Sequence, residues 1–239
     1  MQINLEPQQA LEVINEAKSI CLLTNQASET DSVATMMAFY HLFKNYKKIR
    51  VVVPEEVPSS CHSLPESSII EKDLGPKKLA ISLDTNGVSL EKISYLQEGR
   101  TFKLIVHPER RSFEVERISY EYLGYSFDLF FFIGVHGLSE VAPLFNYDFS
   151  ELSARPSINL DVRSDNELFG SINLVDPTSV SVCEMFFKML GSWKINFSRE
   201  VSLCLLTGLA NSPNPKDSLR VFPEIKSSYP DLKSENGLP

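Results

Sequence analysis

Residues 158–184 read INLDVRSDNELFGSINLVDPTSVSVCE, and this stretch decides the fold class of the chain. Its apolar start predicts a buried strand that ends on the acid Asp161. A second short apolar piece follows at 172–175. Asp176-Pro177 then predicts a helix start, because aspartate is a preferred N-cap and proline suits the first helical position. Open α/β sheets bind their ligands beyond the carboxyl ends of the strands. An ordinary strand-loop-helix connection and an active site both fit this spacing.

Further apolar runs of strand length precede this stretch, at 19–24, 49–53 and 127–135. Between the first two lie a polar loop and a helical pattern, so these segments predict a βαβ unit with a right-handed crossover. Continuous apolar strands are typical of a parallel sheet covered on both faces. The sequence therefore predicts an α/β fold with a doubly wound parallel sheet. Helices are predicted at 7–17, 33–44, 138–152, 179–190 and 198–209.

A different pattern occupies residues 76–123, where short alternating or β-rich runs are separated by turn residues. It predicts a small antiparallel β-meander inserted into an α/β domain that spans residues 1–212. Asp84 and His107 within the insert are interpreted as structural residues. Residues 55–76 are rich in Pro, Ser and charge and are interpreted as a linker. Residues 213–239 lack periodicity and are interpreted as a flexible or loosely packed tail, or the start of a linker.

The composition is that of an ordinary globular protein, with 43% hydrophobic and 23% charged residues. The net charge of −8 argues against a broad basic surface for nucleic acid and leaves a local groove as an alternative. The four cysteines lie far apart without metal-ligand spacing, and we expect reduced core residues of a cytoplasmic protein. The first residues show no secretion signal. The longest apolar run is too short to span a bilayer, so no membrane partner is expected.

The stretch 158–184 resembles the third motif of the DHH phosphoesterase superfamily, which includes RecJ-like nucleases, oligoribonuclease/pAp phosphatases and cyclic-dinucleotide phosphodiesterases. Val162 and Arg163 stand where the two histidines that name the family would be. The resemblance implies an N-terminal DHH domain with degenerate motifs. The positions that match the family pattern without a gap are Ile158, Asn159, Asp161, Asn166, Phe169, Gly170, Ile172, Asn173, Leu174, Val175, Asp176, Pro177 and Glu184.

The first family motif falls on the polar loop after the strand at 19–24. In this register Asn25 takes the histidine position, and Glu29 and Asp31 take the two aspartate positions. Two carboxylates two residues apart on such a loop can share one hard divalent cation, and a histidine beside them favours a softer one such as Mn²⁺. The loop therefore keeps the carboxylate pair of the motif and loses the histidine.

The second and fourth motifs have lost their aspartates. The metal-bridging aspartate of the second motif falls on Gly134, with His136 two residues further on. The fourth motif is similar to LLTGL at 205–209, and Ser212 stands at its aspartate position. Family members use two Mn²⁺ or Mg²⁺ ions to activate water, and two ions need a bridging carboxylate and several anionic ligands. The resemblance implies that this chain cannot hold an ordinary pair of metals.

Three carboxylates remain that could hold one Mn²⁺ or Mg²⁺ ion, namely Glu29, Asp31 and Asp161, with His136 as a weak fourth ligand. Asp31 and Asp161 are also the candidates for catalysis. Arg163 argues against a metal, because a guanidinium is always charged and can pair with Asp31 or Asp161 in the place of the ion. Candidate substrate-binding residues are Arg163, Asn166 and Ser179.

Two functional classes follow. The first is a non-catalytic phosphoesterase-like protein without a cofactor that binds a nucleotide, a short oligonucleotide or a protein partner in the ancestral cleft. The alternative is a divergent metal-dependent phosphodiesterase or phosphatase for short oligonucleotides or small nucleotides of the pAp or cyclic-dinucleotide type. Replacement of the ligands favours the first class, and a homodimer is compatible with either. The chain has no glycine-rich GGGH-type run, so the C-terminal DHHA1 domain of the family is expected to be absent or truncated.

Overall fold

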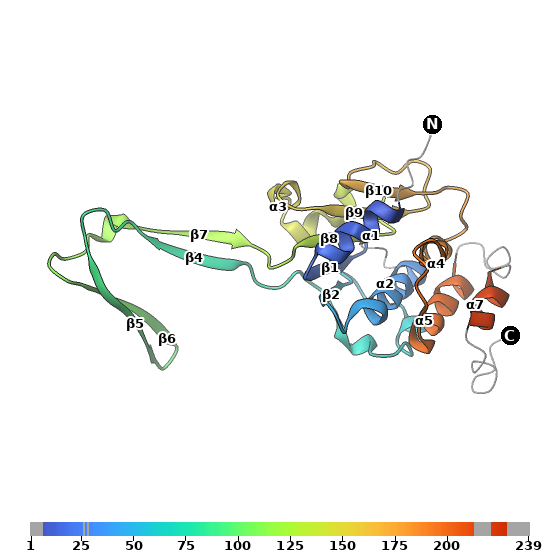
Figure 1. The fold of residues 1–239 in the computed structure, drawn as a ribbon, viewed down its shortest axis with the longest axis horizontal. Coiled ribbons are helices and arrows are strands. Elements are labelled where there is room, and N and C mark those ends of the chain that lie inside the picture. The colour runs from blue at the N-terminus through green and yellow to red at the C-terminus, as the bar shows by residue number, and fades with distance from the viewer. Residues whose placement is uncertain (1–6, 26, 28, 213–220, 229–239) are drawn as a thin grey trace. The chain divides into compact units, whose positions relative to one another are not determined.

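The computed structural model describes residues 7–25, 27, 29–212 and 221–228, without the side chains of residues 151 and 226–228. The chain divides into two compact units (Figure 1). One contains the described residues up to Gly75 and from Ser126 onward, and the other is Pro76–Tyr125.

The first unit is built on a parallel sheet of six strands in the order β10-β9-β8-β1-β2-β3. From β1 the chain moves outward to β2 and β3, and it returns on the other side of β1 to form β8, β9 and β10. This reversal makes the sheet doubly wound, as predicted, with its switch point between β1 and β8. The strands are β1 (Ser19–Leu23), β2 (Lys48–Val52), β3 (Ile70–Glu71), β8 (Leu129–Ile133), β9 (Ser157–Asp161) and β10 (Ile172–Val175).

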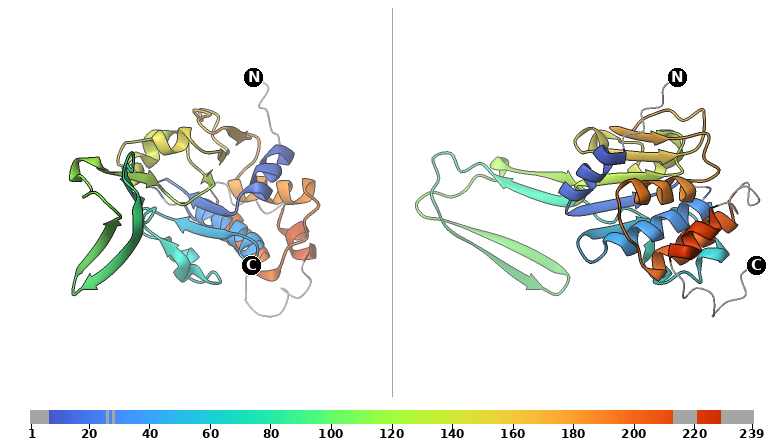
Figure 2. Two further views of the ribbon diagram at one scale, coloured as in Figure 1. Left: turned by 60° about the vertical axis from the view of Figure 1, so that its left-hand side comes forward. Right: turned by 45° about the vertical axis from the view of Figure 1, so that its right-hand side comes forward.

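The helices of this unit lie mainly on one face of the sheet (Figure 2). Neighbouring residues of a strand point to opposite faces, and β8 illustrates the division. Phe131 contacts Phe39 of α2, with ring centroids 5.3 Å apart. Phe130 and Phe132 point to the other face and contact Phe145 and Phe169, at 5.6 and 4.9 Å. The helices are α1 (Pro7–Glu16), α2 (Thr30–Phe43), η1 (Ser59–Cys61), η2 (Ser67–Ile69), η4 (Leu138–Phe145), α3 (Ser150–Ser153), α4 (Val182–Ser192), α5 (Arg199–Ala210) and α7 (Phe222–Ser228).

The predicted helix start at Asp176-Pro177 is wrong. The α4 helix begins at Val182, and Ser181 is its N-cap. Asp176 instead closes a turn, because its carboxylate accepts hydrogen bonds from the Thr178 backbone N–H at 3.0 Å and from the Ser179 hydroxyl at 2.7 Å. An aspartate that caps a helix and one that caps a turn present the same local sequence.

The predicted helix at 138–152 is also wrong in kind. Its first part, η4, is a 3₁₀ helix that contains Pro143. Proline has no N–H to donate and clashes with the preceding turn, so an α-helix does not continue through it. Asn146 and Tyr147 then adopt left-handed backbone conformations, with φ of 52° and 62°, which separates η4 from the single turn of α3.

Two segments interpreted as linker and tail contribute to the first unit. The segment at 55–76 contains η1, η2 and β3, and it buries Cys61 and Leu64. The part of the tail that the structure describes is α7, which buries Ile225 in the main core. Single apolar residues among polar neighbours give no periodic pattern, yet each can still reach a core. The rest of the predicted tail, 213–220 and 229–239, lies outside the described residues.

The second unit, here called the hairpin unit (Pro76–Tyr125), consists of two nested hairpins. Its strand positions agree with the prediction, but the pairing is not that of a meander, because the first strand pairs with the last. The Asp84 carboxylate accepts a hydrogen bond from the backbone N–H of Asn86 at 3.0 Å and so closes a turn. His107 Nε2 lies 2.9 Å from the Ser94 hydroxyl on the opposite strand. The elements are β4 (Lys78–Leu83), β5 (Leu90–Glu98), β6 (Thr101–Pro108), η3 (Val115–Arg117) and β7 (Ile118–Gly124).

All four cysteines are buried and unpaired, as expected of core residues. Within the described part of the chain, no helix combines the length and the apolar character that a membrane crossing needs.

Candidate functional site

The candidate site lies at the switch point of the sheet, where the carboxyl ends of β1, β8 and β9 meet. The polar groups here come from loops that directly follow these strands. Asn25 follows β1, Gly134 follows β8, and Asp161 is the last residue of β9. The buried strands fix these positions, so the local geometry follows from the parallel register of the sheet.

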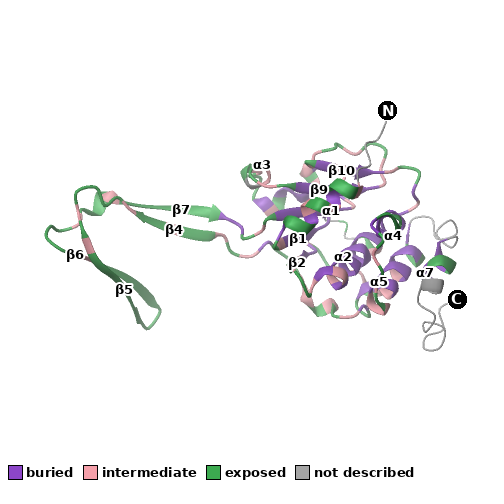
Figure 3. Cartoon of the chain, viewed as in Figure 1, coloured by how far each residue is buried: buried purple, intermediate pink, exposed green. Residues whose placement is uncertain are grey.

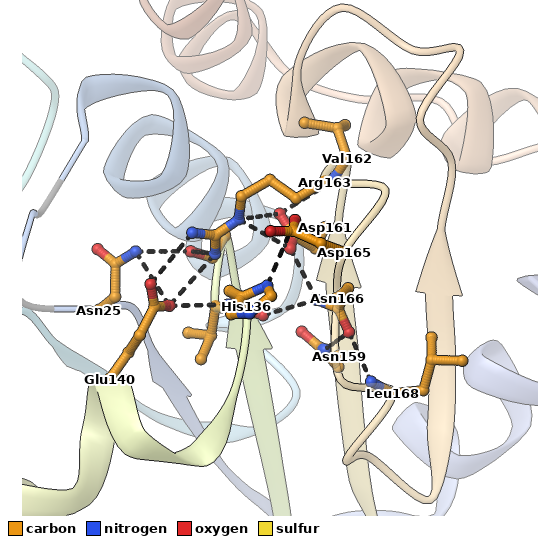
Figure 4. Close-up of polar contacts among 12 residues, drawn as sticks. Asn25, His136, Glu140, Asn159, Asp161, Val162, Arg163, Asp165, Asn166 and Leu168 are labelled. Atoms are coloured by element: carbon orange, nitrogen blue, oxygen red, sulfur yellow. Dashed lines mark hydrogen bonds and ion pairs between the residues drawn. The ribbon is translucent and has the colours of Figure 1, made fainter.

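Arg163 is the centre of the site, and its guanidinium bonds to three groups at once (Figure 4). Its Nε donates to Asp161 Oδ2 at 3.0 Å, and its Nη1 donates to Glu140 Oε1 at 3.1 Å. Its Nη2 donates to the carbonyl oxygen of Gly134 at 2.8 Å. The predicted pairing of Arg163 is therefore with Asp161 and not with Asp31. We call Arg163, Asp161 and Glu140 the arginine-carboxylate network.

Glu140 is the residue of this network that the sequence analysis missed. It lies on η4, and its carboxylate also accepts hydrogen bonds from the backbone N–H of His136 at 2.7 Å and from the Asn25 amide at 3.3 Å. Burial alone would raise the pKa of Glu140, but these donors and Arg163 together hold it below its usual range. The one available clue was an acid within the apolar run LSEVAPLF, whose residues belong to no family motif.

Asp161 is buried, and its carboxylate accepts hydrogen bonds from three protein groups. Besides Arg163, it accepts from the Val162 backbone N–H at 2.9 Å and from Asn166 Nδ2 at 2.7 Å. Asn166 also donates to the carbonyl of Val135 at 2.9 Å, and its own carbonyl oxygen accepts from Asn159 at 3.0 Å. The predicted substrate-binding residues Arg163 and Asn166 thus come together, and both are used to hold Asp161.

Asp31, a predicted metal ligand, caps the start of helix α4. It is buried at the start of α2, and its carboxylate accepts hydrogen bonds from the backbone N–H groups of Val182 and Cys183 at 2.8 and 3.1 Å. These are the first two residues of α4, so the carboxylate satisfies N–H groups that lack partners within the helix. Burial raises the pKa of Asp31 to about 6 despite these bonds. Glu29 is exposed at the N-cap of α2 and makes no side-chain cap.

Gly134, where the resemblance puts a bridging aspartate, has no room for a side chain. Gly134 has a φ of 67°, and a Cβ atom added to it would lie 2.0 Å from the Ser32 hydroxyl oxygen. A side chain at this position would also be strained, because left-handed backbone favours glycine. A residue with a side chain does not fit at this position without displacement of Ser32, which lies on α2.

The other predicted site residues lie beside the network or apart from it. His136 is adjacent, with its Nδ1 3.6 Å from the exposed carboxylate of Asp165. Ser179 belongs to the turn before α4, where it bonds to Asp176 at 2.7 Å and to Lys188 at 3.0 Å. Ser212 is buried just after α5. Among the hydrogen bonds of the described residues, none links Ser179 to the arginine-carboxylate network.

The donor set does not fit a divalent metal. Across the described residues, no three His, Cys, Asp or Glu side chains are grouped so that they could hold an ion. A cation about 4 Å from the guanidinium would meet a repulsion of about 4 kcal/mol per unit of its charge at an effective dielectric of about 20. The network instead matches the fork-shaped pairing that guanidinium groups make with carboxylates.

Comparison with known proteins gives a fold relationship. No protein-family model matches the sequence, and no curated protein matches it. The structure is similar to the crystal structure of an exopolyphosphatase-related protein from Bacteroides fragilis, with a TM-score of 0.58 and 16% sequence identity. The match covers 96% of this chain, which spans 61% of the length of that protein. At this identity the likeness shows a shared α/β fold.

Proposed function

We propose that this protein is a non-catalytic, degenerate relative of the DHH phosphoesterases, and that the arginine-carboxylate network stands in place of their metal centre. The observation that carries the proposal is the position of Arg163, bonded to Asp161, Glu140 and the carbonyl oxygen of Gly134. Asp161 and Gly134 lie at the strand ends where the resemblance puts metal ligands, and Glu140 reaches them from η4. Protein groups donate hydrogen bonds to both carboxylates, which supports the view that the guanidinium takes the place of a cation.

The charge of the network favours a protein partner over a nucleotide as its ligand. Two carboxylates, Asp161 and Glu140, surround one guanidinium, and the carboxylate of Asp165 lies next to His136. A phosphate group would meet net negative charge there. Most N–H donors of the Arg163 guanidinium already bond to Asp161, Glu140 and Gly134. Few donors are left for the bidentate hydrogen bonding by which arginine binds phosphate. We therefore propose that the carboxyl-end edge of the sheet contacts protein.

Titration with Mn²⁺ and Mg²⁺ in a thermal-shift experiment tests the metal part of this proposal. We expect no saturable rise in the melting temperature, because a ligand that binds only the folded state would stabilise it by mass action. The matched control is Asp161→Asn, which removes the buried carboxylate and preserves its shape. A saturable rise of several degrees in the wild type that disappears in Asp161→Asn would contradict the proposal.

Incubation with pApA, pAp and bis-p-nitrophenyl phosphate in the presence of Mn²⁺ tests the catalytic part. We expect no turnover, and no saturable binding heat with pApA or pAp. Turnover that is present in the wild type and lost in both Asp31→Ala and Asp161→Ala would establish the alternative, a divergent metal-dependent phosphoesterase. Far-UV circular dichroism of the two variants shows whether such a loss reflects chemistry or unfolding.

A further inference from the structure

The hairpin unit carries most of the large apolar side chains that are exposed in the described part of the chain. Of the 16 large hydrophobic residues that are exposed in the described chain, 13 lie within Pro76–Tyr125. Only two residues of this unit are buried, Gly124 and Tyr125, at the end of β7. Figure 3 shows the same contrast between exposed hairpins and a buried sheet. The unit as it stands has no core of its own.

The outer ribbon, formed by β4 and β7, has one apolar and one polar face. In its antiparallel register Leu79 lies opposite Tyr122, and Ile81 lies opposite Tyr120. Residues directly opposite each other and residues two apart on a strand share a face. The next pair, Leu83 and Ile118, therefore extends the same apolar row. The other face carries Ala80, Ser82, Ser119 and Glu121.

The inner ribbon, formed by β5 and β6, repeats this arrangement. Ile93 lies opposite Val106, and Tyr95 lies opposite Leu104. Phe102 shares their face and stacks on Tyr95, with ring centroids 5.6 Å apart. The other face is more polar and carries Ser94, Leu96, Glu98, Thr101, Lys103 and Ile105. Both ribbons are thus amphipathic in the manner of strands that cover a core.

A two-stranded sheet with an uncovered apolar face is at best marginally stable in water, and stability needs further strands or a packed layer. Contiguous exposed apolar surface of this extent marks an interaction site. The regular alternation over both ribbons is what packing between sheets requires, with inner faces apolar and outer faces polar. The two ribbons therefore need a covering layer of complementary β-structure.

We propose that this layer is the hairpin unit of a second copy of the chain, so that the apolar ribbon faces of two copies pack together in a symmetric dimer. A twofold interface brings the same patch of both subunits together and requires that the patch be self-complementary. Two faces with the same alternating aromatic and aliphatic rows satisfy this requirement. Their stacking would form a small sandwich with the ordinary spacing between sheets.

The charge of the hairpin unit also suits a second copy. It contains eight Lys and Arg residues and seven Asp and Glu residues, for a net charge of +1, whereas the whole chain carries −8. The remaining residues therefore carry −9. Two hairpin units meet with almost no mutual repulsion, whereas contact through the rest of the chain would oppose two strongly acidic surfaces. The near balance of charge also gives no attraction for nucleic acid.

The area is sufficient for a stable dimer. Tyr95, Phe102, Tyr120 and Tyr122 are 75%, 64%, 79% and 70% exposed. At roughly 200 Å² per aromatic side chain, these four rings alone offer on the order of 600 Å² per copy. A standard interface buries about 800 Å² per partner, and the aliphatic residues of the two faces supply the difference. Tyrosine and phenylalanine are also enriched at protein interfaces.

Sedimentation equilibrium of the full chain over a wide range of concentration tests the proposal. The wild type is expected to be a dimer. The variant Phe102→Lys/Tyr120→Lys puts one lysine on each apolar face, and we expect dimerisation at least about thirtyfold weaker for each aromatic residue replaced. The matched control, Thr101→Lys/Ser119→Lys, puts the same charges one residue away on the opposite faces, and it should remain a dimer.

Two further measurements keep the test independent of folding failures. The only tryptophan, Trp193, lies in the first unit, so its fluorescence shows whether that unit stays folded in each variant. Amide hydrogen exchange of β4 and β7 should be slow in the wild-type dimer and fast in Phe102→Lys/Tyr120→Lys. A wild type that is monomeric at every concentration would overturn the proposal, as would slow exchange in a monomer or an unchanged dimer with lysines on the apolar faces.

Discussion

Asp31 shows how the environment of one carboxylate sets its chemistry. Burial raises its pKa from 3.8 to about 6, although two backbone N–H groups of α4 bond to it. The folded state therefore binds the Asp31 proton more tightly than the unfolded state does. The free energy of unfolding should fall as pH rises from about 4 to about 6, by on the order of 3 kcal/mol from this group. Below that window Asp31 is protonated in both states, so the stability no longer changes with pH through this group.

The Asp31→Asn variant isolates this effect from the titration of other groups. We expect the stability of the wild type relative to Asp31→Asn to decrease across this window, measured by urea unfolding at several pH values. Glu29→Gln is the control, because Glu29 is an exposed acid two residues away and its removal should leave most of the pH dependence. A constant difference in the free energy of unfolding between the wild type and Asp31→Asn at all pH values from about 4 to about 6 would contradict the raised pKa of Asp31.

Single residues also show where sequence reasoning about the site succeeds and fails. Pairing of Arg163 with Asp161 is one of the two predicted alternatives, because a guanidinium is always charged and can pair with a carboxylate in the place of an ion. Glu140 could not be predicted, because it reaches the site from a 3₁₀ helix that is 23 residues away in sequence. The steric block of Gly134 by Ser32 could not be predicted either, because it depends on how close two chain segments lie in the fold.

At the scale of elements, α4 has a start signal that the sequence analysis passed over. Ser181 accepts a hydrogen bond from the Glu184 backbone N–H at 3.0 Å, and the Glu184 carboxylate accepts from the N–H of Val180 at 2.8 Å. This is close to the reciprocal capping box, for which S-x-x-E is the signature. The wholly apolar strands were predicted within about two residues, since a parallel strand buried on both faces leaves a continuous run. Strand pairing in the hairpin unit was not predicted, because alternation alone does not select a partner.

Ser181→Ala gives a test of the helix start whose sign is informative. If Ser181 is the N-cap of α4, its replacement should lower the free energy of unfolding by about 1 kcal/mol, measured in urea. If the helix began at Pro177, Ser181 would be an interior residue, and alanine would be neutral or slightly stabilising. Pro177→Ala is the matched control, and we expect it to change stability little, because this residue is exposed in a turn.

At the scale of the whole molecule, the two units differ in how they can be stable. The first unit has a large core in which strands, helices and the cap by Asp31 support one another. In the proposed dimer, the hairpin unit depends on the covering layer that its partner supplies. The first unit should therefore fold without the hairpin unit, whereas the hairpin unit should need its partner.

Replacement of residues 76–125 by a short Gly-Ser link tests this difference. A short link can join the two cut ends, because Lys78 at the start of β4 pairs with Gly124 at the end of β7, and paired strands lie about 5 Å apart. A short flexible link adds little closure entropy. We expect the thermal unfolding midpoint, followed by Trp193 fluorescence, to stay within a few degrees of that of the Phe102→Lys/Tyr120→Lys monomer, and the shortened protein to be monomeric. Trp193 is a suitable probe, because it is 7% exposed and donates a hydrogen bond to the carbonyl of Pro7 at 2.7 Å. Loss of a cooperative transition would mean that the hairpin unit supports the fold of the first unit, and a persistent dimer would place the interface outside it.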